Sequence, residues 1–135
     1  MDQGARPVAD LGPLTRKVMQ YQGVIKQLVP TARTPQDWAP LAEFVSVEHF
    51  ERIGTFLEVH DWRQYTQMLS QWARSIDTFE TTVKRISELP GLVYFEIEER
   101  HVRNQRAHIV NSMTVFEFDA DAKIRHLAVY LQQPQ

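Results

Sequence analysis

The chain has 135 residues, 43% of them hydrophobic and 10% aromatic, which is enough for one globular domain with a buried core. Its formal net charge of −2 gives no electrostatic case for binding nucleic acid, and the absence of cysteine excludes disulfides and thiolate chemistry. No apolar run reaches the roughly 18–20 residues of a membrane-spanning helix, and the start of the chain lacks the apolar segment of a signal peptide. We therefore expect a cytoplasmic protein with a flexible tail over residues 1–13 and a single domain over residues 14–132.

The first half of the chain carries apolar residues at helical spacing. The first stripe predicts a helix and consists of residues three or four positions apart: Leu14, Val18, Tyr21, Ile25 and Leu28. Thr34 followed by Pro35 predicts the N-cap and first position of a short second helix through Trp38. Asp61 is the expected N-cap of a third helix, whose stripe is Trp62, Tyr65, Met68, Leu69 and Trp72.

The remaining segments read as strands. Residues 44–50 (FVSVEHF) predict a short strand with Val45, Val47 and His49 on one face. Residues 79–86 alternate and are β-branched, and residues 91–132 predict three further strands joined by polar turns. Helices followed by an antiparallel meander indicate an α+β domain, in which helices cover one face of a curved sheet and leave a pocket at its open end.

Two stretches and this element order resemble the nuclear transport factor 2-like superfamily. The segment LAEFVSVEHF is similar to that family's passage from the second helix into the first strand, and VFEFDADAKIRHLAVYL is similar to its closing hairpin. The resemblance implies a cone-shaped α+β domain with three helices packed on a strongly curved antiparallel sheet. The superfamily includes ketosteroid isomerase, scytalone dehydratase, limonene epoxide hydrolase and the SnoaL-like polyketide cyclases, so the resemblance specifies a fold more closely than a reaction.

The resemblance also implies positions for catalytic groups. On the isomerase pattern, His49 falls where the family keeps its proton-shuttling carboxylate, Thr114 where it keeps a protonated acid, and Tyr21 near its oxyanion tyrosine. On the epoxide hydrolase pattern, Glu99 falls on one catalytic aspartate, while Ile97 replaces an arginine. Neither complete constellation is present.

The strongest chemical hypothesis from the residues themselves is a pair formed by His49 and Glu99. Strand alternation places Glu99 on one face with Phe95, Ile97 and His101, and in this fold that face points into the cone. A carboxylate beside an imidazole in an apolar cup would take and return a proton near neutral pH. The alternative is a buried structural pair, or a strand parity that leaves either side chain in water.

Arg85 is a further candidate. It shares strand parity with Phe79 and Val83, so it would clamp the same carboxylate or an anionic substrate. The alternative is a surface arginine.

Aromatic residues predict an apolar cavity for a ring-bearing or terpenoid-like molecule. Trp38, Trp62 and Tyr65 are the expected lining residues because tryptophan and tyrosine keep a polar group for an oriented ligand. Tyr65 or Tyr21 would donate a hydrogen bond to a developing oxyanion. Further substrate-binding candidates are Arg85, Phe95, Ile97, His101, Thr114 and Phe116. Core packing is the alternative for each aromatic.

No metal site or cofactor is expected, because the histidines lack the spacing of a metal-binding pair. The outer sheet face is expected to be half-polar, and the resemblance implies a homodimer in which two such faces pack together. Its expected residues are Asn111, Met113, Val115, His126, Ala128 and Tyr130.

The leading functional prediction is a cofactor-independent acid–base enzyme of the isomerase, dehydratase, cyclase or epoxide-opening kind, acting on a hydrophobic small molecule. The alternatives are a non-catalytic carrier of such a ligand and a dimeric adaptor protein. Convergent ionisable groups in a cavity would favour the enzyme, and a purely apolar cup would favour the carrier.

Overall fold

The computed structural model describes residues 12–134. The tail predicted over residues 1–13 lies outside this range except for Gly12 and Pro13, where the first helix begins. None of the helices in this range is both long enough and apolar enough to cross a membrane.

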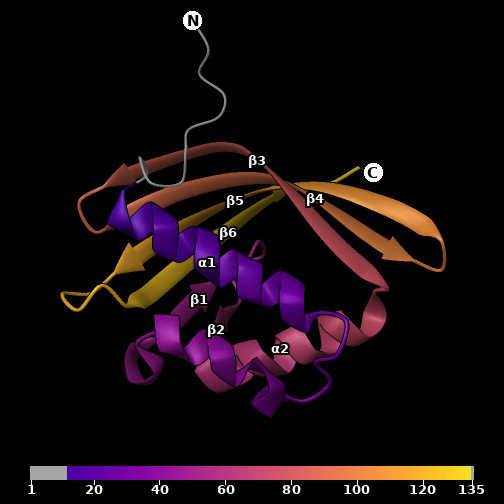
Figure 1. Ribbon diagram of the computed structural model, residues 1–135, viewed down its shortest axis with the longest axis horizontal. Helices are drawn as coiled ribbons and strands as arrows, with labels where there is room; N and C mark the ends of the chain where they lie inside the picture. Colours follow the sequence, from indigo (N-terminus) through magenta and orange to yellow (C-terminus); the bar gives the residue numbers. More distant parts are fainter. Residues whose placement is uncertain (1–11, 135) are drawn as a thin grey trace, which may run out of the picture.

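The described chain is a layer of helices packed on one face of a six-stranded sheet (Figure 1). The helical elements are α1 (Pro13–Leu28), the 3-10 helices η2 (Pro35–Phe44) and η3 (Val47–His49), and α2 (Trp62–Ser75). The strands are β1 (Glu51–Ile53), β2 (Val59–His60), β3 (Thr78–Leu89), β4 (Leu92–Arg103), β5 (Arg106–Phe118) and β6 (Ile124–Gln132). The strand order is β2-β1-β6-β5-β4-β3, and all pairs are antiparallel except β1 with β6. The predicted α+β class and the meander of four long strands are confirmed.

The predicted helix starts are confirmed by their caps. Asp61 accepts a hydrogen bond from the backbone N–H of Gln64 at 2.8 Å, which satisfies a free donor in the first turn of α2. At the start of η2, the backbone N–H of Thr34 donates to Asp37 at 3.0 Å. These caps place α2, which carries Tyr65 and Trp72, against the sheet.

The strand predicted over residues 44–50 is wrong. Val47–His49 form one 3-10 turn, and residues 44–50 pair with the sheet through an isolated bridge between Val45 and Ile124. Val45 and Phe50 are both buried, although residues five apart point to opposite faces of a strand. A turn brings both of these side chains to the core and leaves His49 exposed.

Helix α1 is fastened to the sheet by Glu88 at the end of β3. Its N-cap is Gly12, which has no side chain, and its first turn contains no acid. The Glu88 carboxylate supplies the missing cap, because it accepts hydrogen bonds from the Thr15 backbone N–H at 2.8 Å and from the Thr15 hydroxyl at 2.7 Å. Burial acts to raise the pKa of Glu88, but these hydrogen bonds outweigh it and the net pKa is lowered.

Trp38 lies in the core and does not line a cavity, which corrects the prediction for this residue. It is fully buried, and its indole N–H donates to the Ser70 hydroxyl on α2 at 3.1 Å. The hydroxyl in turn donates to the Thr66 carbonyl at 2.7 Å. Trp38 therefore joins η2 to α2 instead of holding a ligand.

Arg85 faces away from the helices, which corrects the prediction that it would clamp a carboxylate or an anionic substrate in the cavity. The register of β3 on β4 shifts between Val83 and Arg85, so Val83 pairs with Ile97 but Arg85 pairs with Glu96. A bulge of this kind changes the face to which every later residue points. Arg85 is 78% exposed and forms an ion pair with Glu96 on the outer face.

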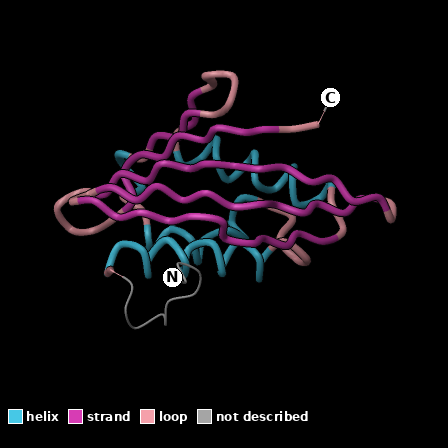
Figure 2. The backbone as a smooth tube through the Cα atoms, turned by 90° about the horizontal axis from the view of Figure 1, so that it is seen from above, coloured by secondary structure: helices cyan, strands magenta, loops and turns pink. Residues whose placement is uncertain are grey.

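No helix covers the outer face of the sheet (Figure 2). Tyr94, Ile109 and Tyr130 are exposed on it. The homodimer expected through this face stays a prediction.

Replacement of Glu88 by glutamine should lower stability at neutral pH by about 1 kcal/mol, because the charge that caps α1 is lost. The folded pKa of Glu88 is lowered, so its stabilisation is present above the unfolded value of 4.5 and is lost as the pH falls through the folded pKa. Urea unfolding of both proteins across the acid range should show the difference shrinking towards low pH. A constant difference at every pH would contradict this role.

Candidate active site

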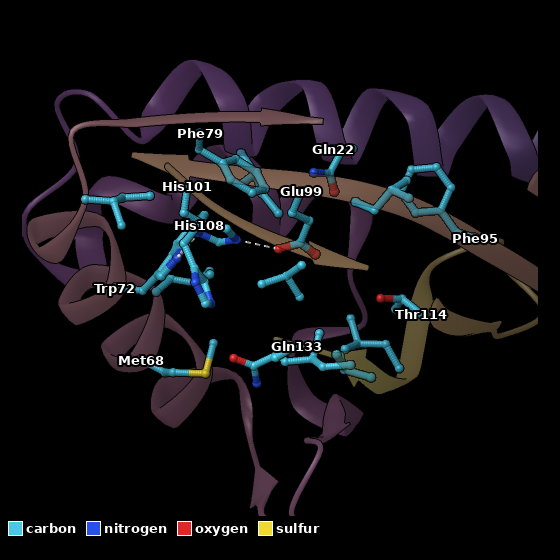
Figure 3. Close-up of a pocket in the computed structure, with 18 of the residues that line it drawn as sticks. Gln22, Met68, Trp72, Phe79, Phe95, Glu99, His101, His108, Thr114 and Gln133 are labelled. Atoms are coloured by element: carbon cyan, nitrogen blue, oxygen red, sulfur yellow. Dashed lines mark hydrogen bonds and ion pairs between the residues drawn. The ribbon is translucent and has the colours of Figure 1, made fainter. Parts of the chain in front are cut away.

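A cavity of about 1210 Å³ lies between the concave face of the sheet and helices α1 and α2 (Figure 3). Its inner wall is apolar and includes Ile25, Leu69, Phe95, Ile97, Phe116 and Leu127. The lining residues near the β4–β5 turn, such as Arg106 and His108, are exposed, so the cavity opens at that end. The pocket expected from the curved sheet is present.

The pairing of β4 with β5 orders the side chains along the cavity. Alternate residues of a strand share a face, and directly paired residues share it across the two strands. From the turn inward, the inner-face pairs are Arg103–Arg106, His101–His108, Glu99–Val110, Ile97–Ser112 and Phe95–Thr114. The lining therefore changes from basic at the mouth, through an acid, to apolar at depth.

Glu99 and His101 form a hydrogen-bonded pair inside the cavity (Figure 3). The distance from His101 Nε2 to Glu99 Oε1 is 2.8 Å, and their side chains are only 16% and 18% exposed. The Trp72 indole N–H donates to His101 Nδ1 at 3.3 Å. An indole N–H only donates, so Nδ1 is the acceptor and the imidazole proton sits on Nε2, where it donates to Glu99.

This arrangement leaves one carboxylate oxygen for a ligand. Both nitrogens of His101 are engaged, whereas Glu99 Oε2 has no hydrogen bond with any residue of the described range. The ring of His101 also packs against Trp72 and Phe79, with centroid distances of 5.7 and 5.1 Å. The Glu99 carboxylate is therefore held in one orientation by His101, which is in turn held by Trp72.

A second polar group lies deeper in the cavity, where the hydroxyls of Tyr21 and Tyr65 are 2.6 Å apart. Burial raises the pKa of both tyrosines, Tyr21 the more strongly, so both carry their protons at neutral pH. The guanidinium of Arg52, 5.9 Å from the Tyr65 ring centroid, acts to lower both pKa values. Only one of the two protons can lie in this hydrogen bond, so one hydroxyl donates to the other and the second proton is left for a ligand.

Arg52 is the most unusual of the residues that sequence reasoning missed. It is 9% exposed, lines the cavity, and donates to His60 Nδ1 at 3.2 Å, with Glu58 at 3.7 Å. The misplaced strand over residues 44–50 hid it, because the true strand β1 begins at Glu51. Trp72 lines the cavity, as expected of an aromatic residue seven positions from Tyr65 on the same helix face, but its hydrogen bond to His101 was not predicted.

The structure separates the predicted site residues into two groups. Those that line the cavity are Tyr21, Tyr65, Phe95, Ile97, Glu99, His101, Thr114 and Phe116. Those that do not are His49, Trp38, Trp62 and Arg85. The predicted His49–Glu99 pair is wrong because His49 is on an exposed turn, and the imidazole beside Glu99 belongs to His101. Trp62 packs on Phe50 and Tyr65 behind the wall, with centroid distances of 5.3 and 5.8 Å.

The described residues contain no group of side chains suited to bind a metal ion. Within residues 12–134, no three histidine, aspartate or glutamate side chains are grouped so as to hold an ion.

No protein-family model and no curated protein matches the sequence. Solved structures do match. A candidate SnoaL-like polyketide cyclase from Shewanella putrefaciens CN-32 has a TM-score of 0.74 at 9% identity, over 97% of this chain and 91% of that one. An NTF2-like protein from Anabaena variabilis ATCC 29413 has a TM-score of 0.72 at 12% identity, over 90% of each chain. An LEH-like epoxide hydrolase of M. tuberculosis has a TM-score of 0.59 at 15% identity, over 84% of each chain. At these identities the likeness is one of fold, and the chain has the fold of the nuclear transport factor 2-like proteins.

Proposed function

We propose that this protein is a cofactor-independent acid–base enzyme that transfers a proton on a hydrophobic, carbonyl-bearing small molecule. The observation that carries the proposal is the Glu99 carboxylate, held at 2.8 Å by His101 inside an apolar cavity. Two ionisable groups within hydrogen-bond reach favour chemistry over simple storage of a ligand.

Glu99 is the proposed base. Its Oε1 is fixed by the Nε2–H of His101, so its Oε2 is free to accept a proton from a carbon next to a carbonyl group. His101 is a positioning residue, because both of its nitrogens are already occupied. Because the Trp72 indole N–H donates to His101 Nδ1, the imidazole proton lies on Nε2, and His101 presents a donor to Glu99.

Tyr65 is the proposed donor to the oxygen that becomes negative when the proton leaves. Burial is the main cause of the raised pKa of Tyr65, and the negative charge of Glu99 adds to it, so the two groups interact electrostatically across the cavity. In the proposed arrangement Tyr65 accepts a hydrogen bond from the Tyr21 hydroxyl 2.6 Å away, and a hydroxyl that accepts such a bond is a better donor than an isolated one. Preorganised donors of this kind stabilise a developing oxyanion.

Two reactions follow from one enolate. Glu99 takes the proton, the electron pair moves to the carbonyl oxygen, and Tyr65 stabilises the charge there. Where a double bond is conjugated with the enolate, return of the proton to the far carbon of that double bond is an isomerisation. Attack of the enolate carbon on a second carbonyl of the same molecule is a cyclisation, in which the new alkoxide takes the proton back from Glu99. A structural neighbour named as a polyketide cyclase candidate is compatible with the second reaction, although the proposal rests on the residues of this chain.

A non-catalytic carrier is the second candidate. The lining of the cavity favours it, because Glu99 is the only aspartate or glutamate among the described residues that line the cavity. A carrier would bind the same class of ligand and leave its carbon-bound protons in place. Measurement of proton exchange therefore separates the two functions.

Replacement of Glu99 by glutamine should slow proton exchange by a factor of about 10² or more, because the amide cannot accept the proton. The measurement is loss of the α-proton signal of 2-tetralone in D₂O, followed by NMR with the wild type and the variant. Glu98→Gln is the matched control, since Glu98 is the adjacent residue on the exposed outer face. Binding of 2-tetralone without any catalysed exchange would favour the carrier.

Replacement of Tyr65 by phenylalanine should reduce the same exchange rate by a factor of about 10² while ligand affinity changes little, because the hydrogen bond strengthens as charge develops. Tyr21→Phe should have a smaller effect, since Tyr65 keeps its own proton. Equal losses of affinity and rate in the Tyr65 variant would argue that the hydroxyl only binds the ligand.

A further inference from the structure

Two arginines stand side by side at the mouth of the cavity. Arg103 and Arg106 are paired directly across β4 and β5, on the inner face, and both line the cavity. Only Asn104 and Gln105 separate them, and both have positive φ, 50° and 67°. Two left-handed residues form the tight hairpin turn that joins twisted strands, so the two side chains are held as neighbours.

These charges lack a counterion. Directly opposed like charges destabilise a sheet unless something neutralises them. The side chain of Arg106 makes no hydrogen bond or ion pair with any residue between 12 and 134, and the side chain of Arg103 donates only through Nε to the Ser75 carbonyl. That bond ties one arginine to the end of α2 and leaves its two terminal nitrogens unpaired.

Neither nearby acid forms an ion pair with these arginines. Asp77 accepts the Asn104 backbone N–H at 2.9 Å, and Glu99 is hydrogen-bonded to His101. The cavity mouth therefore carries two guanidinium groups without an internal carboxylate partner, while the wall behind them is apolar. Guanidinium groups bind carboxylate and phosphate oxygens in a two-pronged geometry.

We propose that Arg103 and Arg106 form a subsite for the anionic head group, a carboxylate or a phosphate, of an otherwise apolar ligand. The inference deepens the proposed function and rests on the cavity being its ligand site. Glu99 lies four residues from Arg103, and four residues of an antiparallel strand span about 14 Å. The ligand is then an amphipathic acid whose reacting carbon lies a comparable distance from its charged end.

The test is isothermal titration calorimetry with three probes that share one alkyl chain: decanoate, decyl phosphate and decan-1-ol. The wild type should bind at least one of the anions tenfold or more tightly than the alcohol. Arg103→Gln combined with Arg106→Gln should weaken that anion tenfold or more and leave decan-1-ol within twofold, which also shows that the variant is folded. A preference for decanoate identifies a carboxylic acid head, and a preference for decyl phosphate identifies a phosphate ester.

Arg63→Gln is the matched control, because Arg63 is an exposed arginine on α2 that does not line the cavity. It should leave all three affinities unchanged. Equal binding of the anions and the alcohol, or anion binding that survives in the double variant, would overturn the subsite, as would binding of none of the probes. The proposed chemistry is judged separately, since Glu99→Gln should keep the anion preference even where proton exchange is lost.

Discussion

The continuous pairing of β4 with β5 is the constraint on which the site depends. The pairs run without a register shift from Leu92–Glu117 to Arg103–Arg106. Because parity is kept over this whole length, one face of β4 carries Glu99, His101 and Arg103 in a fixed line towards the mouth. A shift of one residue would send all three to the outer face and replace them with Glu98, Arg100 and Val102. The register of these two strands therefore decides which of their side chains line the cavity.

The helices complete what the strands begin. A partly buried imidazole and carboxylate are costly unless their hydrogen bonds are made, and α2 supplies the Trp72 donor that satisfies the second nitrogen of His101. The same helix brings Tyr65 to Tyr21 of α1. Two helices and one strand therefore meet around a single space, and Glu99, His101 and the two tyrosines are each hydrogen-bonded to a neighbouring side chain there. Such orientation is what distinguishes a preorganised site from an incidental polar residue in a core.

Sequence patterns predicted the long, regular elements well and the short, irregular ones poorly. The stripe from Leu14 to Leu28 and the alternation through Glu99 both carry many residues that agree with one period, so α1 and the inner face of β4 were predicted correctly. The segment FVSVEHF contains the same alternation by chance over seven residues, and the burial of both Val45 and Phe50 requires a turn. Arg85 was misplaced by one bulge, which leaves no mark in the amino-acid types. The partner of Glu99 was consequently sought in a distant segment, although His101 stood two residues away on the same face.

The two ends of the cavity impose an orientation on any ligand. Arg52 lies at the deep end, because a row of paired residues joins it to the start of β4. Arg52 pairs with Leu127, Leu127 with Phe116, and Phe116 with Val93. Arg103 lies at the other end of β4. The deep end therefore holds hydroxyl donors beside a cation that is already partnered by His60 and Glu58, whereas the two arginines at the mouth have no carboxylate partner among residues 12–134. A full negative charge gains most where guanidinium groups are free and water is near, and a neutral carbonyl gains most from neutral donors in a dry wall. An amphipathic acid would therefore enter with its carbonyl inward and its charge outward, which leaves the carbon between them to Glu99.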